Sequence, residues 1–211
     1  MKDEKETRKK LLDSAKKEFS EKGYEKASLR DICKNAGVTT GALYFFFKDK
    51  DDLFVSLVKQ PFLQVQEIML AHYQEEKEIV WQGNLLRHEK SDDYEAAHQI
   101  MQVLYQFRDE FLLLLTKSQG TSVEHLVDDV VSVSEKHYRL MADAMEQKFH
   151  TKSVDDTMIH YLAHMQMDMF VYMITHIETE EQAERFMEQA IQYMLNGWYG
   201  MFGIEFPLSA Q

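Results

Sequence analysis

Helix start and stop signals follow one another closely in the first fifty residues, and this succession constrains the fold more than any other feature. Ser28 is a good N-cap for a helix of about two turns, and Gly37 stands where a left-handed residue ends such a helix. Thr39 then caps a second short helix whose Leu43 and Phe47, four residues apart, share one apolar face. Two short helices joined by a glycine-containing turn are typical of the helix-turn-helix motif, whose second helix enters the DNA major groove.

Helical patterns also flank this pair. An apolar stripe predicts a helix over about 4–21, which Gly23 would end. Asp49 is placed to cap a long following helix, in which Pro61 is expected to cause a kink or a restart. The sequence therefore predicts a three-helix DNA-binding domain over 1–48 and a larger domain over 49–211.

Charge divides the chain at the same place. Residues 1–50 hold 13 Lys and Arg against 9 Asp and Glu, a net of +4, whereas the remainder holds 11 against 27, a net of −16. A basic segment can approach phosphates, and an acidic one is repelled by them. The two parts are therefore expected to have different functions.

The acidic remainder also has a helical pattern, and the low counts of 8 Gly and 2 Pro favour an all-α fold. A longer connection is expected over about 78–93. The helical patterns beyond Pro61 cover about 61–77, 94–117, 122–149, 154–177 and 180–202.

The run from Ser28 to Leu53 resembles the DNA-binding signature of the tetracycline-repressor (TetR) family. The strongest matches are Ala36-Gly37-Val38, Gly41, Leu43-Tyr44, Phe47, Lys50 and Leu53. The resemblance implies an all-helical homodimer of about nine helices per subunit, in which the first three helices bind DNA. The other helices would bind a small molecule, and ligand binding would move the fourth helix and release the protein from a palindromic operator.

The same resemblance gives the residues expected at the DNA, with Lys50 meeting a phosphate. Thr40 stands where many members have a basic residue, and Phe45 and Phe46 replace a pair that usually includes a hydrogen-bonding side chain. A phenyl ring can pack against a thymine methyl, although burial of these two rings in the core is an equal alternative. The predicted DNA-binding residues are Ser28, Thr39, Thr40, Gly41, Tyr44, Phe45, Phe46, Lys48 and Lys50.

The last two helical segments are the predicted dimer interface. The final one is apolar every three to four residues, and the one before it is apolar on nearly all sides, so each needs partners on more than one face. Ordinary intrachain core is the alternative, but a symmetric operator requires a two-fold protein. The predicted interface residues are Met158, Tyr161, Phe186, Ala190, Met194, Gly197 and Trp198.

Methionine and tyrosine side chains of the acidic part are candidates for an adaptable ligand pocket, with plain core packing as the alternative. The acidic balance favours a neutral or cationic, partly apolar effector. The candidate pocket residues are Met69, Met101, Tyr105, Tyr138, Met141, Met165, Asp168, Met169 and Tyr172.

Three further polar residues, His160, His164 and Asp168, share one helix face, and a hydrogen-bonded cluster is a better interpretation of them than a metal site. No metal and no cofactor are therefore expected.

Other functions find little support. A carboxylate-bridged di-iron enzyme needs two Glu-x-x-His motifs, and the chain offers one, at Glu95 to His98. No nucleotide-binding loop or nucleophile elbow is found, so an enzyme is not expected. The absence of long apolar stretches and the single Cys33 predict a cytoplasmic protein without membrane spans. A metal- or cofactor-binding helical enzyme, or a helix-turn-helix assembly module without DNA binding, are the alternatives to a ligand-responsive repressor.

Overall fold

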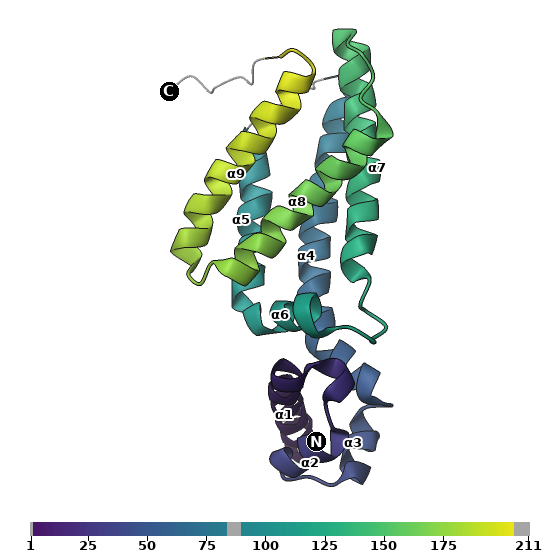
Figure 1. Ribbon diagram of the computed structural model, residues 1–211, viewed down its shortest axis with the longest axis vertical. Helices are drawn as coiled ribbons and strands as arrows, with labels where there is room; N and C mark the ends of the chain where they lie inside the picture. Colours follow the sequence, from purple (N-terminus) through teal and green to yellow (C-terminus); the bar gives the residue numbers. More distant parts are fainter. Residues whose placement is uncertain (1, 84–89, 205–211) are drawn as a thin grey trace. The chain divides into compact units, whose positions relative to one another are not determined.

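The computed structural model describes residues 2–83 and 90–204, which form nine α-helices and no strand (Figure 1). This confirms the prediction of an all-α fold of about nine helices with an N-terminal helix-turn-helix. The helices are α1 (Lys2–Lys26), α2 (Leu29–Ala36), α3 (Thr40–Phe46), α4 (Lys50–Trp81), α5 (Lys90–Gln106), α6 (Arg108–Lys117), α7 (Leu126–Phe149), α8 (Asp156–His176) and α9 (Glu180–Met201).

Several predicted boundaries were wrong. The single helix expected over 94–117 is two helices, α5 and α6, which meet at Phe107. Of the kink or restart expected at Pro61, the restart does not occur, because α4 continues through this residue. Gly23 does interrupt α1, with a φ of 74°, although helical turns resume beyond it. Residues 84–89 of the expected connection lie outside the described residues.

The chain divides into two compact units. The first comprises residues up to Gln64 together with Phe107–Leu126, and the second comprises Val65–Gln106 with the chain from Val127 onward. The first unit thus contains α6 and the beginning of α4 besides the predicted DNA-binding domain. The boundary at residue 48 remains a prediction about function.

The first unit is built around one apolar core. Helices α1 to α4 contribute fully buried side chains, among them Phe19, Leu43, Phe47 and Phe54. Leu113 of α6 is buried in the same core. The apolar residues on which the sequence prediction rests therefore lie on the faces that these helices bury against one another.

The second unit combines α5, α7, α8, α9 and the later part of α4. One apolar cluster joins α7, α8 and α9 around Met145, Ile159 and Phe202. This unit also buries polar groups, since the Tyr73 hydroxyl hydrogen-bonds both Ser134 and Gln166. None of the described helices has a stretch long and apolar enough to span a bilayer.

Candidate nucleic-acid interface

Helices α2 and α3 begin and end where their capping residues dictate. The Ser28 hydroxyl accepts from the Asp31 N–H at 3.3 Å, and the Thr39 hydroxyl accepts from the Ala42 N–H at 3.2 Å. Between them Gly37 adopts the left-handed conformation, with φ 69° and ψ 31°, and its N–H is directed at the last carbonyls of α2. These three residues fix the short turn that separates the two helices.

Helix α3 buries one face and exposes the other. Leu43 and Phe47, which caps its C-terminus, lie in the core of the first unit. On the opposite side, Tyr44 is 58% exposed and Phe45 is 71% exposed, although both are large aromatic residues. Large exposed apolar side chains gathered on one short helix indicate a contact surface. The other exposed residues of this surface are Thr39, Thr40, Gly41 and Lys48.

The two neighbouring phenylalanines have different environments. Phe46 is half-buried and packs against the core of its unit, whereas Phe45 points outward and touches Phe46 edge-on, with ring centroids 4.9 Å apart. Of this pair, Phe45 is therefore the one presented to a partner.

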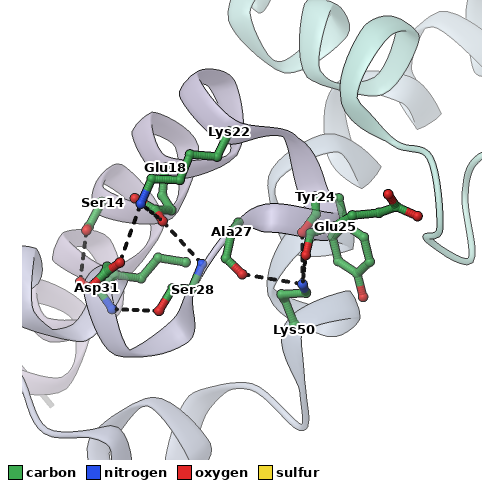
Figure 2. Close-up of polar contacts among 10 residues, drawn as sticks. Ser14, Glu18, Lys22, Tyr24, Glu25, Ala27, Ser28, Asp31 and Lys50 are labelled. Atoms are coloured by element: carbon green, nitrogen blue, oxygen red, sulfur yellow. Dashed lines mark hydrogen bonds and ion pairs between the residues drawn. The ribbon is translucent and has the colours of Figure 1, made fainter.

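Lys50 has a different place from the expected one. Its ammonium donates to the backbone oxygens of Tyr24 at 2.8 Å, Glu25 at 3.2 Å and Ala27 at 3.4 Å (Figure 2). It also lies 4.5 Å from the centroid of the Tyr24 ring. An ammonium has three N–H donors, so this geometry uses them all on the last turn of α1 and the residue that follows it. The structure thus gives Lys50 a positioning role in place of the predicted phosphate contact.

A second polar network, around the buried carboxylate of Glu18, holds the start of α2 (Figure 2). Glu18 accepts from the Lys22 ammonium at 2.7 Å and from the Ser28 N–H at 3.2 Å. The hydrogen bond to Glu18 raises the pKa of Lys22. Lys22 also lies 3.4 Å from Asp31. Ser28, predicted at the DNA, is thus also part of the scaffold.

Sequence reasoning missed this network, and it also missed the hydrogen bonds that Lys50 donates to the end of α1 and to Ala27. The i,i+4 spacing of Glu18 and Lys22 was visible in the sequence. However, nothing in the sequence indicated that Glu18 is buried or that Lys50 reaches back more than twenty residues.

In the second unit, α8 and α9 carry an exposed aromatic surface, with Tyr161 and Tyr172 on α8 and Tyr193 on α9. Phe186 is half-buried and contacts Tyr172, with ring centroids 5.5 Å apart. Of the other predicted interface residues, Gly197 is exposed and Met158, Ala190, Met194 and Trp198 are half-buried.

Trp198 packs within its own unit. Its ring centroid lies 5.5 Å from that of Tyr138 and 5.2 Å from that of Phe202. It therefore contributes to the core around Met145, whatever else it contacts.

The candidate pocket residues differ in their burial. Asp168 and Tyr172 are exposed, which argues against a place in an enclosed cavity. The Tyr105 hydroxyl donates to the Ile177 oxygen at 2.9 Å, beyond the end of α8. Tyr138 and Met141 pack against the core around Met145, Met69, Met101 and Met169 are buried, and Met165 is half-buried.

The three polar residues of α8, His160, His164 and Asp168, also differ in exposure. His160 pairs with Glu135 of α7 at 3.1 Å, and its ring lies 4.6 Å from that of His164. His160 and Asp168 are both exposed. The trio therefore lies toward the outer side of α8.

Comparison with known proteins gives a consistent result. Residues 11–57 match the family described as bacterial regulatory proteins, tetR family. The transcriptional regulator AcrR of Shigella flexneri is 43% identical over 67 residues, which are 32% of this chain and 31% of that protein. The repressor BepR of Brucella suis is 43% identical over 65 residues, 31% of each chain. These two alignments thus span about a third of each relative.

Two further similarities extend over nearly the whole chain. A helix-turn-helix regulator of Staphylococcus aureus strain USA300 is 28% identical over 205 residues, 92% of this chain and 94% of that one. A solved TetR-family regulator from Syntrophomonas wolfei has a TM-score of 0.57 at 19% identity, covering 93% of this chain and 97% of its own. The second similarity shows a shared fold.

The capped α2 and α3, with one face of α3 in the core and the other exposed, define a protein of the helix-turn-helix class. The match over residues 11–57 and the relatives agree with this class. Residues 11–57 thus match the DNA-binding domain of the tetR family of bacterial regulatory proteins, and the chain as a whole is similar to TetR-family regulators.

Proposed function

We propose that this protein is a homodimeric transcriptional repressor that leaves a palindromic operator when a small molecule binds its second unit. As the sequence analysis expected, the effector would be neutral or cationic and partly apolar. A protein acting on chromosomal DNA in this way works in the cytoplasm.

The exposed face of α3 is the observation that carries the proposal. This helix is fixed at its start by the Thr39 cap and along its buried side by Leu43 and Phe47. Its outer side presents Tyr44 and Phe45, which have apolar surface for sugar and thymine methyl groups, and the Tyr44 hydroxyl can hydrogen-bond a phosphate or a base. A rigid helix presented in this way is what major-groove recognition requires.

A second copy is the proposed partner of the aromatic surface of α8 and α9. Tyr161, Tyr172 and Tyr193 are 50–72% exposed, and burying three such rings contributes a large share of the energy of a stable interface. A two-fold dimer would place two α3 helices in successive major grooves, roughly 34–36 Å apart.

DNA binding is tested by fluorescence anisotropy with the region upstream of the protein's own gene, over a series of salt concentrations. We expect affinity to fall steeply as salt rises, because phosphate contacts release counterions. Tyr44→Ala should weaken binding by about tenfold or more, as expected for loss of one groove contact. Trp81→Ala is the matched control, since Trp81 is also a largely exposed aromatic residue and lies at the other end of α4.

The dimer is tested by size-exclusion chromatography with light scattering. Tyr172→Glu, which places a charge in the proposed interface, should give a monomer with weakened operator binding. A dimer that binds no DNA at low salt would overturn the repressor and favour the assembly module. A wild-type monomer would overturn the two-fold model.

A further inference from the structure

Three side chains with metal-ligand chemistry come together in the second unit. His72 and Glu76 lie one turn apart on α4, and Asp93 comes from α5. The Nε2 of His72 lies 3.5 Å from Oε2 of Glu76 and 3.3 Å from Oδ1 of Asp93. One ligand atom from each of the three lies within 4.8 Å of the others.

These separations fit a single ion. A four-coordinate metal with ligand distances of about 2.0–2.2 Å places its ligand atoms roughly 3.3–3.6 Å apart. The two measured distances from His72 fall in that range. Each of the three side chains is only 12–16% exposed, so an ion bound there would be largely shielded from water but still reachable.

His137 of α7 extends the cluster. Its Nε2 lies 2.6 Å from the same Oε2 of Glu76, as expected when an imidazole N–H donates to a carboxylate. Its ring stacks on Tyr73 with centroids 3.9 Å apart and planes at 4°. Tyr73 is fixed in turn by its hydrogen bonds to Ser134 and Gln166. His137 is therefore held where it can orient Glu76 or become a fourth ligand.

We propose that His72, Glu76 and Asp93, assisted by His137, bind one divalent transition-metal ion. Imidazole nitrogens favour zinc and its neighbours over magnesium and calcium, which prefer sites made of oxygen alone. The two carboxylates supply negative charge that a divalent cation neutralises. Ligands on three helices also form a rigid frame, as a preorganised site requires.

The sequence predicts no metal site here, for a physical reason. The i,i+4 spacing of His72 and Glu76 was visible, but such pairs are common on helix surfaces. Asp93 and His137 join them only through the packing of α5 and α7 against α4, which no local pattern reports. The trio considered from the sequence, with His160, lies on the outer side of α8 instead.

Isothermal titration of the full-length protein, stripped with EDTA, tests the site with Zn²⁺, and Co²⁺ serves as a spectroscopic probe. We expect one ion per chain and visible Co²⁺ absorption bands that Zn²⁺ abolishes. Glu76→Gln and His72→Gln should each weaken Zn²⁺ binding at least tenfold, and Mg²⁺ in excess should not compete. His137→Gln should weaken it by about 10–100-fold, the usual effect of a residue that orients a ligand.

His160→Gln is the matched control, because it removes an exposed histidine that also pairs with a glutamate. Circular dichroism and thermal unfolding establish that each variant is folded, and Asp93→Asn replaces any variant that is not. Zn²⁺ binding that survives in Glu76→Gln and Asp93→Asn would overturn the site. Equal loss in His160→Gln, displacement by Mg²⁺, or binding of an organic monocation with no Zn²⁺ binding would overturn it as well.

Discussion

The two units of this molecule carry their chemistry in opposite ways. In the first, the candidate interface consists of consecutive residues on one short helix. In the second, the candidate site gathers residues from three helices, and His137 stacks on Tyr73, which hydrogen-bonds Ser134. A surface on one helix is determined by residues adjacent in the sequence, whereas a site between helices depends on tertiary packing.

The largest expected effect is the loss of the first unit's core. Phe54 is fully buried and contacts the rings of Phe19 and Tyr24, with centroids 5.1 and 5.6 Å away. Phe54→Ala should lower the free energy of unfolding by about 3–5 kcal/mol, because it removes these contacts and leaves a cavity. We expect operator binding to be lost while Zn²⁺ binding persists, as anisotropy and calorimetry would measure.

Phe45→Ala is the control for this substitution. Phe45 is an aromatic residue of the same size but is exposed, so stability should change by no more than about 0.5 kcal/mol. Loss of Zn²⁺ binding together with DNA binding in Phe54→Ala would mean that the two units fold as one, and the contrast between them would fail.

Alkaline pH should act mainly on the second unit. Burial raises the pKa of Tyr73 to about 12, from 10.0 for an accessible tyrosine. Because the folded state favours the neutral phenol, this stabilisation is complete below pH 10 and is lost as pH rises from 10 to 12. By linkage it amounts to roughly 2–3 kcal/mol. For Tyr73 alone, chemical denaturation at pH 8 and pH 11 should therefore differ by about 1.4 kcal/mol, roughly half of this amount.

Replacing the buried Tyr73 with Phe should reduce that pH dependence. Burial also raises the pKa of Tyr199 to about 12, so part of the dependence remains in Tyr73→Phe. Ultraviolet absorbance at high pH follows the ionisation directly. Titration of all tyrosines together near pH 10 in the folded protein would contradict the prediction.

The same contrast explains what could be predicted from sequence. Ser28, Gly37 and Thr39 act on their immediate neighbours, so the helix-turn-helix was predictable from caps and stops alone. The end of α5 at Gln106 was not, since no glycine or proline marks it. The break at Phe107 allows Leu113 of α6 to enter the core of the first unit, and tertiary packing therefore decides it.

Site residues follow the same rule. The exposed face of α3 follows from helical periodicity once Leu43 is known to be buried. By contrast, Lys50 donates to carbonyls more than twenty residues earlier, and Glu76 meets His137 sixty-one residues later. No spacing rule covers such sequence separations. The hydrogen bonds of Lys50 and the cluster of His72, Glu76, Asp93 and His137 could therefore not be predicted.

A moderate effect on stability is expected for one of the two lysines that follow α3, Lys50, and not for the other, Lys48. Lys50→Met removes an ammonium that donates to three backbone oxygens and should destabilise the first unit by roughly 1.5–3 kcal/mol, the range for a charged hydrogen bond. Because these donors bond to the protein itself, the folded variant should release as many counterions on operator binding as the wild type. The slope of log affinity against log salt concentration should therefore be unchanged. Thermal unfolding and salt-series anisotropy measure the two quantities.

Lys48→Met should give the opposite pattern. Lys48 is exposed at the end of α3, so its loss should leave stability nearly unchanged and reduce the salt slope by about one. A reduced slope in Lys50→Met with unchanged stability would instead restore the phosphate contact that the sequence predicted.

The smallest change adds one methyl group to α3. Gly41 has no left-handed backbone angle, and a Cβ there would meet only the Thr39 hydroxyl, at 3.8 Å. Gly41→Ala should therefore stabilise the helix by about 1 kcal/mol. The same methyl group stands on the exposed face, where it would hold a DNA backbone away, so operator affinity should fall while the melting temperature rises. Gly37→Ala should lower stability instead, because Gly37 has a φ of 69° in the turn. If Gly41→Ala gained stability with no loss of affinity, the outer face of α3 would not approach DNA closely, and the contact surface would have to be sought elsewhere on the first unit.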